Sequence, residues 1–172
     1  MKKMILILSV VLLSSCNKKE ESAKNDPSDS SIKMDYPYKI KNPDNWAVGS
    51  SENTMVALKA LKSWENGNLD ETLTYFGDSV IVKFDALDKK MSNDSLKVFF
   101  TKNRNKYKTI KENVEDWESV ISKDKSEEWV TIWYTDISET KNGVKDSIAI
   151  VNDLKLKDGK IIRIDEYTRK LH

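Results

Sequence analysis

The feature that most constrains the fold is a change in hydrophobic periodicity after Lys108. Before this residue, apolar side chains recur at the three- and four-residue spacing of amphipathic helices, and after it they alternate with polar side chains as in half-buried strands. We predict four consecutive strands over residues 113–122, 128–138, 145–156 and 160–168. The Asn-Gly and Asp-Gly pairs between the last three strands tolerate positive φ and favour tight hairpins. The second half of the chain is therefore predicted to be an antiparallel meander.

Three helices are predicted in the first half of the chain. The first lies between a serine N-cap at position 50 or 51 and Gly67, the second runs from Asn68 through Phe76, and the third runs from Ser92 through Tyr107. The apolar positions that give the first helix its core face are Met55, Ala57, Leu58, Leu61 and Trp64. Each helix is thus expected to bury one face.

A short strand pair is predicted between the second and third helices. Residues 80–84 alternate in the manner of a strand, and residues 88–91 are placed to pair back with them. Early helices followed by long hairpins predict an α+β domain in which the helices cover one face of the sheet.

This order of elements resembles the NTF2-like superfamily, including its SnoaL-like and ketosteroid-isomerase-like members. The local motifs that carry the resemblance are the helix segment 57–70, the Trp-Tyr-Thr-Asp run at 133–136, and residues 157–162 before the last strand. The resemblance implies a domain over residues 45–172, shaped as a cone in which three N-terminal helices pack on a curved antiparallel sheet, with a cavity between them. Because this fold carries isomerases, cyclases, dehydratases, transport factors and binding modules, it leaves the function open.

The N-terminus has the pattern of an export signal. A short basic start is followed by a ten-residue apolar run, which is too short for a bilayer that needs about twenty residues. Residues 13–16, Leu-Ser-Ser-Cys, resemble the lipobox of bacterial lipoproteins. The resemblance implies removal of residues 1–15, acyl chains such as palmitate on Cys16, and anchoring in the cell envelope, with the outer membrane as the expected site. The polar residues 16–44 would form a flexible tether, and the Lys-Lys-Glu-Glu run at 18–21 resembles the export tags of surface lipoproteins in Bacteroidetes.

Charge and residue counts exclude several classes of function. The sequence has 29 basic and 28 acidic residues, and removal of residues 1–15 takes away two lysines, which leaves 27 and 28. The remaining chain is nearly neutral and has no block of basic residues that would mark a nucleic-acid site. Cys16 is the only cysteine, so no disulfide forms, and His172 is the only histidine, so no metal centre or cofactor is expected. The acid-rich stretches 112–118 and 124–128 lack calcium-loop spacing and are expected to be solvated charges.

Strand alternation selects candidate cavity residues. Residues separated by an even number of positions on a strand project from the same face of the sheet. A polar side chain therefore points into the cavity when apolar side chains at such positions before it face the helices. The residues selected are Tyr134 and Asp136 (after Val130 and Ile132), Asn152 (after Ile148 and Ile150) and Glu166 (after Ile162 and Ile164). Trp64 on the first helix and Trp117 on a long strand complete the candidates. The open alternative is that Asp136 and Glu166 lie in solvent near strand ends.

Trp129 and Trp133 share the strand face opposite the predicted cavity. Aromatic side chains in this position cover the back of a sheet, or they form a binding surface or subunit interface. The resemblance implies that an outward tryptophan stripe would suit a homodimer formed through the outer face of the sheet.

Three functional hypotheses follow. The leading hypothesis is an envelope lipoprotein whose domain binds a small apolar ligand or a protein partner without catalysis. The first alternative is a cofactor-free isomerase or hydratase that uses Asp136 or Glu166 with Tyr134. The resemblance implies a carboxylate base beside a tyrosine and a second acid. The family's positions do not match this sequence residue by residue. The absence of a cavity histidine counts against an enzyme. The second alternative is an interaction module that dimerises through the sheet.

Overall fold

The structure is a computed structural model that describes residues 35–41 and 45–171. The predicted signal peptide, Cys16 and most of the predicted tether lie outside the described residues. Residues 35–40 belong to one compact unit and form neither helix nor strand, and residues 41–172 belong to a second unit that holds every described helix and strand. None of the described helices is long and apolar enough to cross a membrane.

The second unit is built on a seven-stranded sheet in the order β1-β4-β5-β6-β7-β2-β3. Its strands are β1 (Trp46–Val48), β2 (Phe76–Phe84), β3 (Leu87–Ser92), β4 (Tyr107–Ser122), β5 (Glu128–Thr140), β6 (Lys145–Lys157) and β7 (Lys160–Lys170). The four long predicted strands and the β2–β3 pairing are confirmed. Strand β1 was not predicted, since its three residues are too few to show a period.

The expectation of a wholly antiparallel sheet is wrong at one position, because β2 pairs with β7 in parallel. Consecutive strands joined by tight turns are forced to be antiparallel, whereas strands separated by a long stretch of chain are free to pair in either direction. One helix and four strands separate β2 from β7 along the sequence. The sheet is therefore mixed.

The three helices are α1 (Ser51–Glu65), α2 (Leu69–Thr74) and α3 (Asn93–Arg104). The N-terminus of each helix is capped by the side chain of a residue that the sequence predicted for this role. The backbone N–H of Asn53 donates to Ser50 Oγ at 3.0 Å, and Asn68 and Ser92 accept from the third residue of their own helices. These caps satisfy backbone donors that the first turn of a helix leaves unpaired. At the end of α1, Gly67 adopts a φ of 74° that favours glycine.

Two helix predictions are corrected by the structure. Phe76 and Tyr107 were expected at helix ends, but they begin β2 and β4, because α2 is capped at Tyr75 and α3 at Asn105. Met55 is 50% exposed instead of facing the core. The small side chains Ala57, Ala60 and Ser63 of α1 are buried in its place.

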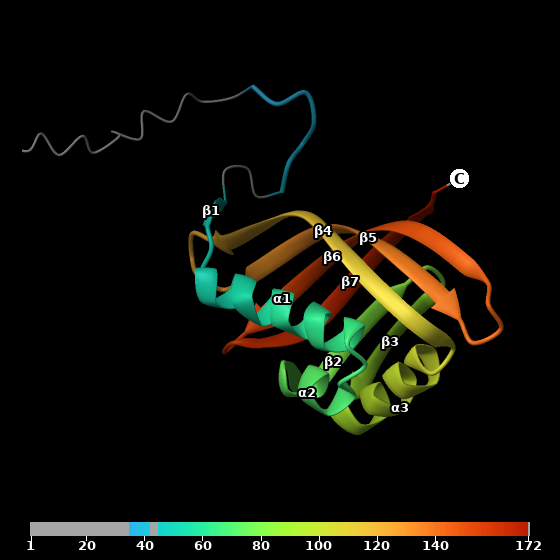
Figure 1. Cartoon of the computed structure of the whole chain (residues 1–172). Coiled ribbons are helices and arrows are strands. Elements are labelled where there is room, and N and C mark those ends of the chain that lie inside the picture. Colours follow the sequence, from blue (N-terminus) through green and yellow to red (C-terminus); the bar gives the residue numbers. More distant parts are fainter. Residues whose placement is uncertain (1–34, 42–44, 172) are drawn as a thin grey trace, which may run out of the picture. The chain divides into compact units, whose positions relative to one another are not determined.

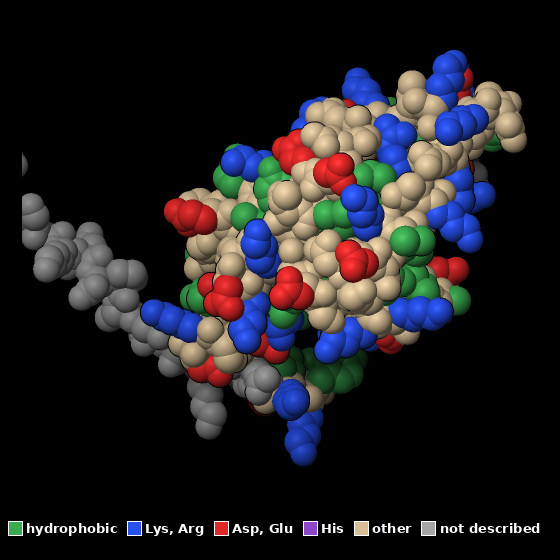
Figure 2. Space-filling view, turned by 90° about the horizontal axis from the view of Figure 1, so that it is seen from below, with side chains coloured by type: hydrophobic (Ala, Val, Ile, Leu, Met, Phe, Trp, Pro, Cys, Tyr) green, Lys and Arg blue, Asp and Glu red, His purple; other side chains and the backbone are tan. Residues whose placement is uncertain are grey.

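The helices cover one face of the curved sheet, and the core lies between the two layers (Figure 1). The largest fully buried apolar side chains come from α3 and from the inner sheet face: Val80, Val82, Leu96, Val130, Ile132 and Ile161. On the outside, positive and negative side chains are interspersed over the face seen in Figure 2.

A register shift in β7 decides which of its residues face the helices. Leu156 pairs with Ile161 and Lys155 pairs with Arg163, so one extra residue is inserted in β7. Ile161 is buried, and Ile162, which was expected to face inward, is displaced from the core face. Beyond the shift the alternation resumes, and Ile164 and Glu166 both point toward the helices.

Candidate functional site: an acidic cavity between the sheet and the helices

A cavity of about 280 Å³ lies between the helix layer and the inner face of the sheet. Its walls are mostly apolar and aromatic, contributed by α1, α3 and the strands. Its polar lining residues are Thr72, Asn103, Tyr107, Glu112, Tyr134, Asp136, Asn152, Glu166 and Thr168. A concave apolar space with a few converging polar groups is the usual form of a small-molecule site.

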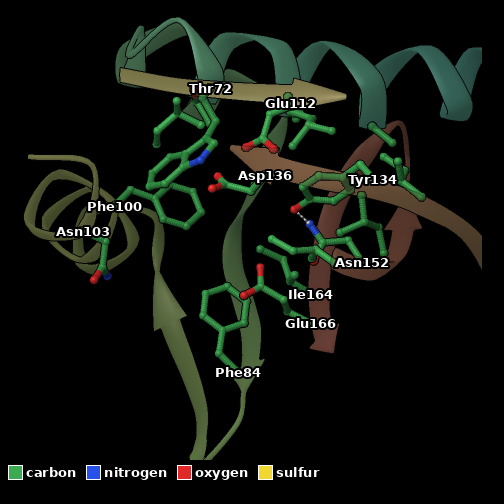
Figure 3. A pocket seen from close by; sticks show the side chains of 18 of the residues that line it. Thr72, Phe84, Phe100, Asn103, Glu112, Tyr134, Asp136, Asn152, Ile164 and Glu166 are labelled. Carbon is green, nitrogen blue, oxygen red and sulfur yellow. Dashed lines mark hydrogen bonds between the residues drawn. The ribbon is translucent and has the colours of Figure 1, made fainter. Parts of the chain in front are cut away.

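Two carboxyl groups meet on neighbouring strands at one end of this cavity. Glu112 on β4 pairs directly with Asp136 on β5, so both side chains project from the same face of the sheet. Figure 3 shows the two carboxyl groups turned toward each other. Burial raises the pKa of Glu112 from 4.5 to about 9, and the charge of Asp136 and a hydrogen bond with it act in the same direction. The pair therefore holds a proton at neutral pH.

Asp136 is the member of this pair that carries the negative charge. Burial raises the pKa of its carboxyl group, but hydrogen bonds from Ser138 and Glu112 lower it and oppose the effect. Glu112 receives no such help, since its Oε2 atom is buried without a hydrogen-bond partner in the described structure. The unequal surroundings assign the proton to Glu112.

A third carboxyl group faces the same space from β7. Burial raises the pKa of Glu166 from 4.5 to about 7, and the charge of Asp136 adds to the increase. In Figure 3, Glu166 lies across the open space from Asp136, near the ring of Phe84. A carboxyl group with a pKa near 7 exchanges its proton readily at neutral pH.

Tyr134 and Asn152 form a polar pair beside the carboxyl groups. Asn152 Nδ2 donates to Tyr134 Oη at 2.9 Å, as the dashed line in Figure 3 shows. Tyr134 is only 4% exposed, and burial, followed by the charges of Glu166, Glu112 and Asp136, holds its pKa well above 10. The phenol thus keeps its proton and offers it to the cavity. On the other side, Asn152 Oδ1 is buried and has no hydrogen-bond partner among the described residues.

The structure brings together five of the sequence-derived candidates. Trp64, Tyr134, Asp136, Asn152 and Glu166 all line the cavity. Trp117 does not line it. This tryptophan is 50% exposed and faces a separate depression beside Ser50 at the start of α1.

Glu112 is a cavity residue that the sequence reasoning missed. It was taken as part of a run of solvated charges because the strand was expected to begin at Asn113. The strand begins at Tyr107, and Ile110 on the same strand is buried. Alternation counted from Ile110 would have placed Glu112 on the inner face.

Trp129 and Trp133 lie on the outer face, as their parity predicted. The ring of Trp129 lies 5.5 Å from Lys155 Nζ and 5.4 Å from Arg163 Cζ, so two cations cover it. Both tryptophans are half-buried within the single chain. The homodimer remains a prediction.

Among residues 35–41 and 45–171, no group of three or more His, Cys, Asp or Glu side chains has the arrangement needed to hold a metal ion. The surroundings of the three cavity carboxyls are apolar and aromatic, which suits an organic ligand better than a hydrated ion.

Comparison with solved structures identifies the class of fold. An NTF2-like protein of unknown function from Exiguobacterium sp. 255-15 matches with a TM-score of 0.56 and 14% identity over 67% of this chain and 99% of the other. An LEH-like epoxide hydrolase from M. tuberculosis matches with a TM-score of 0.57 and 12% identity over 70% and 84%. RV0760c from Mycobacterium tuberculosis, solved with estradiol-17β-hemisuccinate, matches with a TM-score of 0.56 and 12% identity over 69% and 94%.

The second unit thus has an NTF2-like fold, an open curved sheet partly covered by helices. No protein-family model and no curated protein matches the sequence. At such low identity, the similarity describes the fold alone, and function has to be argued from the cavity.

The raised pKa of Glu112 predicts how stability varies with pH. The folded state holds this proton up to about pH 9, whereas the unfolded chain releases it near pH 4.5. The contribution of this proton to the free energy of unfolding is complete below the pKa of Glu112 in the unfolded chain. It is lost as pH rises toward 9, and the free energy of unfolding then falls with a slope approaching about 1.4 kcal/mol per pH unit. Glu112→Gln should flatten this slope when the free energy of unfolding is measured by urea titration from pH 5 to pH 9.

The matched control is Glu118→Gln, which removes an exposed carboxyl from the same strand. This variant should keep the slope of the wild-type protein. An unchanged slope in Glu112→Gln would contradict the assignment of a buried proton to Glu112.

Proposed function

We propose that the domain binds a small, largely apolar organic molecule in the cavity and uses the carboxyl groups and Tyr134 as its polar contacts. The observation that carries the proposal is a cavity whose buried Glu112 Oε2 and Asn152 Oδ1 have no partner in the described structure. Leaving a buried polar atom without a partner costs about 1–3 kcal/mol, so a ligand that pairs with these two atoms would gain free energy on binding. The NTF2-like fold is compatible with this role, since RV0760c was solved with a small molecule bound.

A cavity-filling variant tests this proposal. Ile150 lines the cavity from β6, and Ile150→Trp should fill the space and weaken binding of N-phenyl-1-naphthylamine, a neutral probe that fluoresces in apolar sites, by at least about tenfold. Fluorescence titration measures the affinity. Val98→Trp makes the corresponding change at a position of α3 that is 69% exposed, and it should bind the probe as the wild type does. Equal binding by both variants would contradict the proposal.

A second candidate function is proton-transfer catalysis without a cofactor. It is favoured by Glu166, whose pKa is raised to about 7 by burial and by Asp136, a value suited to a general base at neutral pH. The Tyr134 proton is placed to stabilise an oxyanion in the same space. Such a site would abstract a proton next to a carbonyl group and return it elsewhere.

Deuterium exchange at the α-carbons of cyclohexanone, followed by NMR in D2O, tests the catalytic role. The wild-type protein should accelerate the exchange over buffer, and Glu166→Gln should reduce that acceleration by about 10²-fold or more. Glu118→Gln should leave the rate unchanged. A rate equal to that of buffer would leave the binding role as the only function of the cavity.

We also propose that acyl chains on Cys16 anchor the protein in the bacterial envelope. The lipobox-like residues 13–16 support this role, and two or more acyl chains on one residue give stable membrane attachment. Cys16→Ala should shift the expressed protein out of the membrane fraction after carbonate washing, as judged by immunoblotting. Ser22→Ala, which changes the tether instead, should remain in the membrane. Retention of Cys16→Ala in the washed membranes would contradict the anchor.

A further inference from the structure

We propose that the cavity selects an organic cation, namely a compact ammonium group carried on an apolar or aromatic body. This inference rests on the proposed ligand-binding function and specifies the chemical class of the ligand. It follows from the charges, the unpaired atoms and the aromatic walls of the cavity, each of which points to the same class.

The charge lining the cavity has one sign. Three carboxyl groups, those of Glu112, Asp136 and Glu166, line it, and none of its described lining residues is Lys, Arg or His. The nearby cation, Arg104, is not a lining residue, since its guanidinium donates to the carbonyl oxygens of Trp64 at 3.1 Å and Glu65 at 3.0 Å, although its charge still lowers the pKa of Asp136. Because Glu112 is protonated, the negative charge of the lining is that of Asp136 and of the ionised fraction of Glu166, and no lining side chain neutralises it. A positively charged ligand would do so.

The unpaired atoms require hydrogen-bond donors from the ligand. Asn152 Oδ1 can only accept, and Asn152 Nδ2 donates one of its two hydrogens to Tyr134 Oη. Asp136 and an ionised Glu166 also accept only. A ketone or ether would pair only with donors of the cavity such as the Tyr134 hydroxyl and would leave these acceptors unsatisfied, whereas an ammonium group offers them up to three donors.

The remaining walls suit the body of an organic cation. Aromatic rings line the cavity from α1, α3 and β2, including Trp64, Phe84, Phe99 and Phe100. Phe100 packs edge-on against Trp64 with centroids 5.4 Å apart, and Phe99 lies 5.8 Å from Phe84. Rings held in this manner contact an apolar skeleton and attract a cation through their faces. In Figure 3, the ring of Phe100 lies near Asp136 and the ring of Phe84 lies near Glu166.

Binding of a cation would be coupled to the release of protons. At neutral pH, Glu112 and part of the Glu166 population are protonated because burial raises their pKa values to about 9 and about 7. An ammonium group favours the ionised carboxyls and would displace a proton. The groups that act electrostatically on this cluster are Glu65 of α1, Arg104 of α3, Tyr107 and Glu112 of β4, Tyr134 and Asp136 of β5, Asp146 of β6 and Glu166 of β7.

The sign of the pH dependence therefore identifies the class of ligand. The fraction of Glu166 that is ionised increases about tenfold between pH 6 and pH 8 for a pKa near 7, and an alkylammonium stays charged over this range. The affinity for an amine should thus rise about tenfold from pH 6 to pH 8. A neutral ligand that accepts a hydrogen bond from the protonated carboxyl should show the opposite trend.

The test compares three amines with their matched alcohols by isothermal titration calorimetry at pH 6 and pH 8. The pairs are cyclohexylamine with cyclohexanol, phenethylamine with 2-phenylethanol, and tryptamine with tryptophol. At least one amine should bind about tenfold more tightly than its alcohol at pH 8, with the predicted rise from pH 6. Glu166→Gln should abolish that rise, and Asp136→Asn should weaken amine binding while leaving alcohol binding within about threefold. Glu118→Gln should behave as the wild type, and melting temperatures verify that each variant is folded.

The possible failures of the two proposals are distinguishable. If an alcohol binds as tightly as its amine, or if amine affinity falls as pH rises, the inference of a cation is overturned while the ligand-binding function stands. If no amine binds although N-phenyl-1-naphthylamine does, the inference is also overturned. If neither the probe nor any member of the panel binds, the proposed function itself fails.

Discussion

The burial of three carboxyl groups against an apolar helix layer is the constraint on which the rest of the domain depends. Each buried acid opposes folding unless it is protonated or paired, and here Glu112 is kept protonated while Asp136 is held by hydrogen bonds. The surrounding core compensates for this cost, because fully buried Val82, Leu96 and Ile132 fix the sheet and helices around the cavity. The site is thus a polar region with raised carboxyl pKa values inside an apolar frame.

The two faces of the sheet hold their acids in different surroundings, which the composition does not reveal. The sequence as a whole carries a formal net charge of only +1. The cavity acids face the helices without a lining cation, whereas on the opposite face Glu127 pairs with Lys155 and Asp165 pairs with Arg163. Strand alternation makes this possible, since adjacent residues of one strand project to opposite sides. The nearly balanced net charge gave no sign of an acidic interior.

How much of the site could be predicted from sequence depended on how regular each strand is. Strands β5 and β6 pair without interruption, so alternation placed Tyr134, Asp136 and Asn152 on the inner face without knowledge of the structure. Glu112 was missed because Tyr107 was assigned to a helix and the start of β4 was misplaced. Ile162 was wrongly expected to face inward because an inserted residue leaves no trace in the hydrophobic pattern. The parallel pairing of β2 with β7 depends on contacts distant in sequence, which local periodicity does not record.

The cost of burying unpaired polar groups links the free energy of unfolding to ligand binding in the cavity. In the empty domain, the desolvated carboxyls and the unpaired Asn152 Oδ1 reduce the free energy of unfolding. A ligand that satisfies them binds the folded state alone and stabilises it in proportion to the logarithm of its concentration over its dissociation constant. Replacing the acids with apolar residues would remove their cost, but it would also remove the selectivity that they give to the site. Their retention in the interior is therefore better explained by what the cavity binds than by what the fold requires.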